Sequence, residues 1–185
     1  MPIIDSIRGE FVRYKALAEA AIAQTDDADL SKDPAEDGNS IATVCWHVAG
    51  NLESRFTDFL TTDGEKPWRQ RDDEFLQRQV PRAELLIRWE AGWSVLLATL
   101  SRLDDTHLTR TITIRGQALR VDEALHRSLA HTAYHCGQIV LLAKNSRGTG
   151  WRSLSIPRGK SDEANRSPSA QLPEEHARAL RERRP

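Results

Sequence analysis

The feature that most constrains the fold of this chain is the spacing of its apolar residues, which recur at alternating steps of three and four over long stretches. Such spacing places apolar side chains along one face of an α-helix. The repeat runs through Ile4, Ile7, Phe11, Tyr14, Ala18 and Ala21, and later through Leu86, Trp89, Trp93, Leu96, Leu100 and Leu103. The sequence therefore predicts helices that pack against one another through these faces.

The repeat and its interruptions predict four helices, over about residues 4–24, 40–61, 81–103 and 122–145. Asn39 or Ser40 is a suitable N-cap for the second helix, and Pro81 suits the first turn of the third. Gly92 lies inside the third helix, where it costs about 1 kcal/mol against Ala, so we expect close packing there. Four helices with one long connection and several moderate ones favour a four-helix bundle.

A change of period between Leu108 and Val121 predicts the one sheet element. Thr109, Thr111 and Thr113 alternate there with Arg110, Ile112 and Ile114. Arg115-Gly116-Gln117 then supplies a turn, so the segment reads as a short β-hairpin between the third and fourth helices. The predicted fold class is all-α, with this hairpin as its only strands.

The C-terminal part of the chain differs in character from the rest. Glycine and proline recur after Ser146 and break any regular pattern. We expect residues 1–145 to form the bundle and residues 146–165 to form an extended arm, which Trp151, Leu154 and Ile156 anchor on the bundle or on a partner. We expect residues 166–185 to be a flexible tail with a short helix at 174–183.

Composition excludes several classes of function. Lys and Arg total 26 and Asp and Glu total 27, so the chain lacks the basic excess typical of nucleic-acid binders. No apolar run approaches the roughly 20 residues of a membrane span, and the first residues do not resemble a secretory signal. Two cysteines make no disulfide framework. A cytoplasmic location is expected, without nucleic-acid or membrane partners.

Two histidines, His131 and His135, share one face of the fourth predicted helix. Residues four apart lie about 40° apart around a helix and one turn apart along it, so both rings can point at one ion. They lie at the border of the apolar face, next to Thr132 and Cys136, where ring nitrogens need polar partners. A metal ion is one such partner, and a carboxylate or a water molecule is the alternative.

His47, on the second predicted helix, is the candidate for a third ligand. Asn51, Ser54 and Asp58 continue a polar seam along its side, and this seam can face the one beside His131. The alternative is that the seam is an ordinary solvated face. Three neutral imidazoles suit zinc, nickel, iron(II) or copper, and they leave coordination positions open. Asp58, Gln138 and backbone carbonyls are possible acceptors for the other ring nitrogens.

Other chemistries find less support in the sequence. HTAYH lacks the glutamate of the zinc-peptidase helix HExxH, and a single E-x-x-H at Glu123–His126 does not make a di-iron bundle. Cys45 and Cys136 project toward apolar stripes, which is typical of buried structural thiols. The sequence contains neither a glycine-rich phosphate loop nor a G-x-S-x-G turn.

Two motifs resemble the DinB/YfiT-like superfamily. They are Trp46-His47 with Asn51, and His131-Thr132-Ala133-Tyr134-His135-Cys136-Gly137-Gln138-Ile139, which is similar to the pattern HxxxHxGQI of that superfamily. Residues 151–161 also resemble the ending of an uncharacterised branch, so the resemblance covers about residues 1–161. It implies a four-helix bundle, often dimeric, with one divalent metal held by His47, His131 and His135.

The resemblance also implies a class of reaction. Similar proteins include thiol-dependent transferases and isomerases that use bacterial low-molecular-weight thiols, and metal-dependent hydrolases. We therefore expect a homodimeric transferase whose metal, zinc, nickel or iron, presents a small thiol to an electrophile. Arg115, Arg120, Arg152 and Arg158 are candidates for holding a substrate carboxylate. The alternatives are a hydrolase that uses a metal-activated hydroxide and a dimeric metal-binding stress-response protein without turnover.

Overall fold

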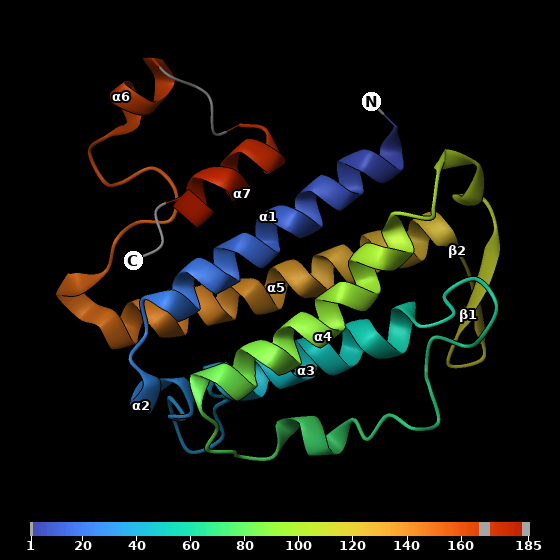
Figure 1. The fold of residues 1–185 in the computed structure, drawn as a ribbon, viewed down its shortest axis with the longest axis horizontal. Helices are drawn as coiled ribbons and strands as arrows, with labels where there is room; N and C mark the ends of the chain where they lie inside the picture. The colour runs from blue at the N-terminus through green and yellow to red at the C-terminus, as the bar shows by residue number, and fades with distance from the viewer. Residues whose placement is uncertain (1, 167–170, 183–185) are drawn as a thin grey trace.

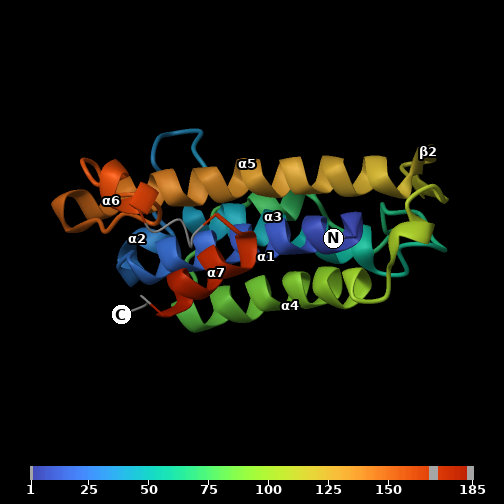
Figure 2. The ribbon, with the colours of Figure 1, turned by 90° about the horizontal axis from the view of Figure 1, so that it is seen from above.

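A computed structural model describes residues 2–166 and 171–182 of the chain. Its core is a four-helix bundle of α1 (Ile3–Ala23), α3 (Ile41–Phe56), α4 (Arg82–Leu100) and α5 (Val121–Arg147). Figure 1 shows that α3 and α4 run in one direction, and that α1 and α5 run in the opposite one. In Figure 2, α1 and α3 lie between α4 on one side and α5 on the other. The predicted all-α bundle is confirmed.

The core contains large aromatic side chains from three of these helices. The ring of Phe11 on α1 meets Phe56 and Trp93 edge-on, with centroids 6.4 and 6.3 Å apart. Burial of each such side chain stabilises the fold by about 1.5–3 kcal/mol. Gly92 lets α4 approach α3 closely, because a Cβ atom there would lie 2.5 Å from the backbone oxygen of Ala49. The close packing expected at Gly92 is therefore confirmed.

The second bundle helix begins as predicted and ends earlier than predicted. The Ser40 side chain accepts a hydrogen bond from the backbone N–H of Thr43, as an N-cap does. The prediction that the helix continues to Thr61 is wrong, because α3 ends at Phe56 and Asp58 has a positive φ of 48°. The turn places Phe59 against Phe56, with ring centroids 5.1 Å apart. Phe59, which the apolar spacing assigned to the helix, therefore reaches the core from a turn.

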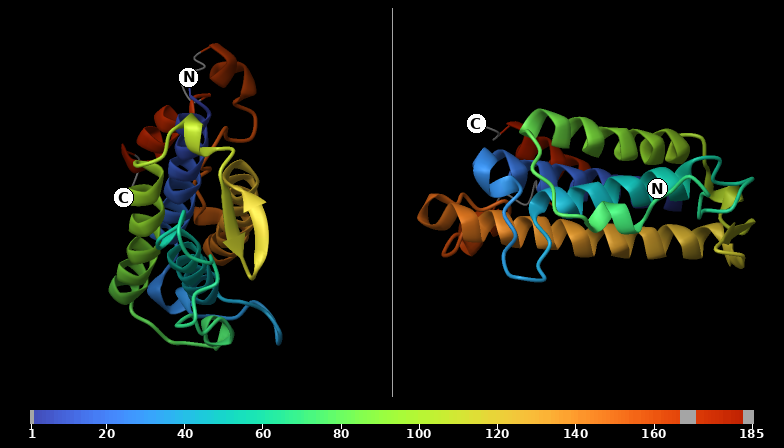
Figure 3. Two further views of the ribbon diagram at one scale, coloured as in Figure 1. Left: turned by 90° about the vertical axis from the view of Figure 1, so that its right-hand side faces the viewer. Right: turned by 90° about the horizontal axis from the view of Figure 1, so that it is seen from below.

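A two-stranded hairpin closes one end of the bundle. β1 (Thr111–Ile114) pairs antiparallel with β2 (Gln117–Arg120), with Ile112 opposite Leu119. Arg115 and Gly116 both have positive φ, 54° and 71°, as in the type I′ turn that suits twisted strands. Asp63 accepts hydrogen bonds from both turn amides at 2.8 Å, so the loop after α3 holds the hairpin against the bundle end, seen in the left view of Figure 3. The predicted hairpin is confirmed.

The connection from α3 to α4 is a long crossover that returns the chain along the bundle. It includes a short 3₁₀ helix, η1 (Asp72–Phe75), which packs against α3 (Figure 1). Because α3 and α4 run in the same direction, the crossover must pass along almost the whole length of α3. This path brings residues of an irregular segment next to the middle of α3.

Short helices that the sequence did not predict occur in the loop after α1, between α4 and the hairpin, and in the C-terminal arm. They are α2 (Asp27–Leu30), η2 (Asp105–His107), η3 (Gly148–Gly150) and α6 (Ser161–Arg166). Trp151 and Leu154 of the arm pack against the bundle core, and Gln24 bonds the backbone N–H and oxygen of Arg152 at 2.8 and 3.1 Å. The arm therefore lies on its own bundle, near the end of α1.

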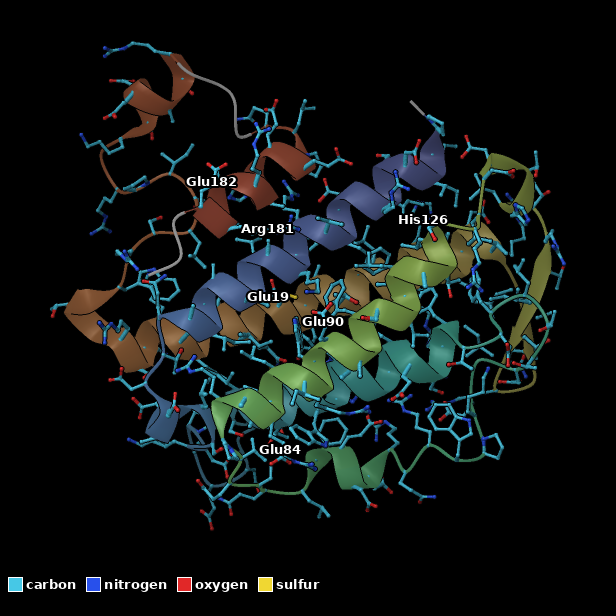
Figure 4. The ribbon with its side chains drawn as sticks, in the orientation of Figure 1. Glu19, Glu84, Glu90, His126, Arg181 and Glu182 are labelled. Atoms are coloured by element: carbon cyan, nitrogen blue, oxygen red, sulfur yellow. The ribbon has the colours of Figure 1, made fainter. Side chains whose placement is uncertain are left out.

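Part of the expected tail is ordered. The predicted short helix is present as α7 (Pro173–Glu182), and Figure 4 labels Arg181 and Glu182 near its end. Ala177 and Leu180 are buried against Ala16 and Ala20 of α1, so the predicted short helix packs on the bundle. Residues 167–170 and 183–185 of the expected tail lie outside the described residues. No described helix combines the length and the apolar character that a membrane span needs.

Candidate metal centre

The structure brings together three histidines from two helices. His47 lies buried on α3, and His131 and His135 lie half-buried one turn apart on α5, which packs against α3. The Nε2 atom of His131 is 3.2 Å from Nε2 of His47 and 3.2 Å from Nε2 of His135. One ligand atom from each residue lies within 4.8 Å of the others, and no second such group of His, Cys, Asp or Glu occurs among the described residues. The predicted residues therefore converge on one point.

A buried carboxylate orients His47. The Nδ1 atom of His47 lies 2.9 Å from Oε2 of Glu74, which belongs to η1 in the crossover. Since an ionised carboxylate only accepts hydrogen bonds, Nδ1 donates to it, and Nε2 is the ring nitrogen left to bind a metal. The Phe75 ring packs over the imidazole with centroids 4.6 Å apart. Sequence reasoning missed Glu74, because it lies 27 residues from His47 in an irregular segment.

The side-chain amide of Gln138 orients His135 so that its Nε2 atom also faces the centre. The Nδ1 atom of His135 donates to Oε1 of Gln138 at 2.7 Å, and the amide nitrogen of Gln138 in turn donates to the Tyr134 hydroxyl at 3.1 Å. Gln138 was one of the predicted acceptors. Asp58, another, lies exposed in the turn after α3 and makes no hydrogen bond to any of the three rings. Nε2 of His135 is therefore also left to bind a metal.

Burial and nearby positive charges keep the α5 histidines neutral. Burial lowers the pKa of His131 to about 3, helped by the neighbouring His135 and His47 rings. Burial also lowers the pKa of His135, although the hydrogen bond to Gln138 opposes it. The Nδ1 atom of His131 is buried and has no hydrogen-bond partner among the described residues. Both rings are thus in the protonation state that metal binding requires.

The geometry of the three nitrogens suits a divalent metal. Zinc binds histidine nitrogen at about 2.0–2.1 Å, and tetrahedral angles then place two ligand nitrogens about 3.3 Å apart. The two 3.2 Å separations agree with that spacing. Nε2 of His47 and Nε2 of His135 both face Nε2 of His131, and in these two rings Nδ1 is already engaged in a hydrogen bond. His47, His131 and His135 are therefore the residues that can hold a metal.

An ion pair fixes the carboxylate that holds His47. Arg69 donates from Nε and Nη2 to the two oxygens of Glu74, each at 2.8 Å. Burial alone would raise the pKa of Glu74, but the bonds from Arg69 and His47 outweigh it and hold the pKa below the ordinary value. Gly50 on α3 provides the space, since a Cβ atom there would lie 2.2 Å from Oε1 of Glu74. The ion pair thus holds this part of the crossover in place next to the metal centre.

A pocket of ≈ 370 Å³ reaches two of the three histidines. Its lining comes from α3, the crossover, the hairpin and the first half of α5, and comprises His47, Asn51, Arg55, Phe56, Phe59, Arg69, Arg71, Ile114, Arg115, Gln117, Leu119, Ala124, Arg127, Ser128 and His131. Of the arginines proposed from the sequence to hold a substrate, Arg115 lines this pocket. Arg120, Arg152 and Arg158 do not line it. The arginines from the crossover and α5 were missed, because the folding of the loop and hairpin decides their position.

The remaining histidines and the cysteines lie outside the centre. His107 pairs with Asp104 at 2.9 Å, and His176 bonds the backbone oxygen of Leu154 at 2.8 Å. His126 lies toward the hairpin end of α5 (Figure 4). Both cysteines are fully buried free thiols, and burial raises the pKa of each well above the ordinary value. This agrees with the predicted structural role of the thiols.

The metal-free protein should lose stability as the pH falls from about 7 to about 5. The pKa values of His131 and His135 lie below the ordinary 6.5, so below pH 6.5 the unfolded chain binds protons that the folded chain excludes. The stabilisation is complete above pH 6.5 and is lost as the pH falls toward the folded value, about 3 for His131. Glu74, with an ordinary value of 4.5, contributes only at lower pH. Urea unfolding at both pH values measures the change, and an unchanged free energy of unfolding would contradict it.

Comparison with known proteins places the chain in a family. No curated protein matches its sequence significantly. A protein-family model described as "Protein of unknown function (DUF1572)" matches residues 2–160, which include the whole bundle, the hairpin and the three histidines. The match covers most of the chain, and we conclude that the chain belongs to the DUF1572 family.

Proposed function

We propose that this protein is a metal-dependent enzyme that binds one divalent ion with His47, His131 and His135 and transfers a low-molecular-weight thiol to an electrophile. The observation that carries the proposal is the convergence of three ring nitrogens beside a pocket, with Nε2 of His131 lying 3.2 Å from Nε2 of each of the other two rings. A metal held by three imidazoles keeps positions open for a small molecule and lowers the pKa of a thiol that it binds. The donor set suits zinc, nickel or iron(II).

The thiol in this proposal comes from solution. Cys45 and Cys136 are fully buried, and burial raises the pKa of each, so neither supplies a thiolate near the centre. The pocket that lies against His47 and His131 gives an external molecule access to the centre. Its volume, ≈ 370 Å³, falls within the range of small-molecule sites.

The chain itself contributes orientation and shielding. Glu74 and Gln138 hold the rings of His47 and His135 in the tautomer that points Nε2 inward. Phe56 and Phe59 form an apolar wall of the pocket, which limits the access of water to a bound molecule. No described residue that lines the pocket is a carboxylate, so water would take the proton of the bound thiol, and the electrophile would release its leaving group to solvent as the new sulfur bond forms.

The motif similarity supports the choice of reaction. The segment from His131 to Ile139 and the pair Trp46-His47 resemble the DinB/YfiT-like superfamily, in which thiol-dependent transferases and isomerases occur. Access to the centre through a pocket also favours an enzyme over a stress-response protein with a covered metal site. A hydrolase that activates water at the same centre is the second candidate, since such a reaction needs no protein base.

A transfer assay tests the proposal. Metal-loaded protein is incubated with monochlorobimane and with bacillithiol, mycothiol or glutathione, and formation of the fluorescent conjugate is followed. We expect one of the thiols to react faster than in the uncatalysed control, and the His135→Ala variant to lose this acceleration. The His126→Ala variant, which alters a histidine of the same helix outside the centre, should keep it. Failure of all three thiols would contradict the transferase, and ester cleavage without thiol would favour the hydrolase.

We also propose a homodimer in the cytoplasm. α4 exposes Ile87, 72% accessible, and Leu86, 37% accessible, next to a shallow groove between α1 and α4. Two neighbouring exposed apolar side chains beside a groove support a partner surface there. Light scattering during size-exclusion chromatography measures the assembly, and we expect twice the chain mass of 20.9 kDa.

A further inference from the structure

The pocket beside the three histidines carries an unusual concentration of positive charge. Five arginines line it, Arg55, Arg69, Arg71, Arg115 and Arg127, and no aspartate or glutamate of the described chain does. Burial lowers the pKa of Arg55, and the charges of Arg69 and Arg115 add to the lowering against the opposing effect of Glu65. Guanidinium groups repel one another at this density, so the pocket is an environment that favours an anion.

Carboxylates outside the pocket neutralise this charge only in part. Glu65 pairs with Arg55 at 3.0 Å and with Arg115 at 2.8 Å. Arg71 has a 3.5 Å pair with Asp72, whose side chain is 99% exposed. Such an exposed pair contributes little.

Arg127 has no carboxylate partner among the described residues. It makes no hydrogen bond or ion pair with any described residue, although its side chain lies at the pocket wall on α5. A cation without a partner that lines a concave surface is available to bind an anion.

Two buried polar atoms of the pocket lining also lack a hydrogen-bond partner among the described residues. They are Oγ of Ser128, a residue only 9% exposed, and Nη1 of Arg69, whose side chain is 2% exposed. The nearest carboxylate oxygen to Nη1 belongs to Glu65 and lies 3.9 Å away, beyond hydrogen-bond distance. Buried polar groups nearly always have partners, so these two donors point to a ligand that accepts hydrogen bonds.

The rest of the lining indicates an organic ligand. Phe56, Phe59, Ile114 and Leu119 form an apolar surface next to the arginines. A volume of ≈ 370 Å³ has room for a small carbon skeleton as well as an anionic group. Inorganic ions alone would leave this apolar surface in contact with water.

We propose that the pocket binds a small organic anion through its carboxylate or phosphate group, with Arg127, Ser128 and Nη1 of Arg69 as donors and the aromatic wall against its carbon skeleton. The inference rests on the proposed function, because the same pocket lies against His47 and His131. The anion is then the molecule, thiol or electrophile, that the pocket presents to the metal centre.

Calorimetric titration of metal-free protein with three probes of similar shape tests the inference. Phenylacetate and phenylphosphonate carry the two anionic groups, and phenylacetamide is the neutral control. We expect one of the anions to bind at least about tenfold more tightly than the amide, as charge-assisted hydrogen bonds predict. The tighter of the two identifies the anionic group. Equal binding of the amide, or no binding of either anion, would overturn the inference.

A matched pair of variants locates the binding. Arg127→Ala should weaken the preferred anion about tenfold or more, because it removes a charged donor. Arg147→Ala removes the same charge from an exposed position on the same helix outside the pocket, and it should leave the affinity unchanged. Equal losses in the two variants would show a general charge effect and overturn the assignment. Both positions are exposed, so both variants should fold, which their melting temperatures check.

Addition of zinc to the same metal-free protein, followed by measurement of the bound metal, separates this inference from the proposed function. Anion preference with no metal bound after addition of zinc would overturn the metal-dependent enzyme and leave the anion site standing. Metal binding at one ion per chain with no anion preference would overturn the anion site alone.

Discussion

The His135→Ala variant should lose at least about 100-fold in zinc affinity, while its fold remains intact. Residues that only orient a ligand already contribute about 10- to 100-fold, so loss of one of three ligands should exceed the upper end of that range. His135 is half-buried at the border of the core, and its only hydrogen bond from Nδ1 goes to Gln138 on the same helix. Competition of the protein with a chromophoric zinc chelator measures the affinity.

His126→Ala is the matched control for this experiment. It removes a histidine from the same helix, and His126 does not belong to the group of possible metal ligands. Its zinc affinity should equal that of the wild type within about twofold. Equal affinities for the His135→Ala variant and the wild type would exclude His135 as a ligand.

The Glu74→Gln variant should lose both stability and metal affinity. Three donors, Nδ1 of His47 and two nitrogens of Arg69, converge on the two oxygens of Glu74, and an amide can accept at only one side. Breaking a buried ion pair from one side costs about 3–5 kcal/mol, and since Gln keeps one acceptor we expect about 3 kcal/mol. Loss of the group that orients His47 should lower zinc affinity about 10- to 100-fold. Urea unfolding and chelator competition measure the two effects.

Two further variants distinguish the effects of lost charge and lost packing from the loss of the group that orients His47. Asp72→Asn removes the same charge from an exposed neighbour in η1 and should change neither quantity appreciably. In the double variant Arg69→Met with Glu74→Met, apolar residues replace both members of the pair, which often restores stability. Its zinc affinity should stay low, because His47 still lacks its acceptor. Recovery of full zinc affinity in the double variant would contradict the role given to Glu74.

The helices and the histidine pair could be predicted because both depend on local spacing. An interval of four places His131 and His135 on one face whatever the rest of the chain does. Of the polar seam predicted beside His47, Asn51 lines the pocket, whereas Ser54 bonds the backbone oxygen of Gly64 and Asp58 lies beyond the end of α3. The packing at Gly92 was predictable for a similar reason, because a glycine inside a helix stripe is costly without a close neighbour.

The parts that were missed depend on contacts between segments far apart in the chain. Glu74 reaches His47 only because the crossover returns along α3, and no periodic pattern fixes the path of an irregular segment. Arg71 and Arg127 face the same pocket only after the crossover and α5 have packed. The helix in the tail was predicted correctly, but the surface on which it packs was not. Leu180 packs against small residues of α1, and small residues in a helix do not indicate which segment will pack against them. Features that depend on local spacing could therefore be predicted from the sequence, and contacts between distant segments could not.

Elemental analysis of the purified protein tests the central claim most directly. The protein is prepared without a chelator and without a metal-affinity step, and its metal content is measured per chain. The convergence of His47, His131 and His135 predicts close to one divalent metal ion per chain, of zinc, nickel or iron. A content near zero that stays near zero after incubation with each of these ions would contradict the account.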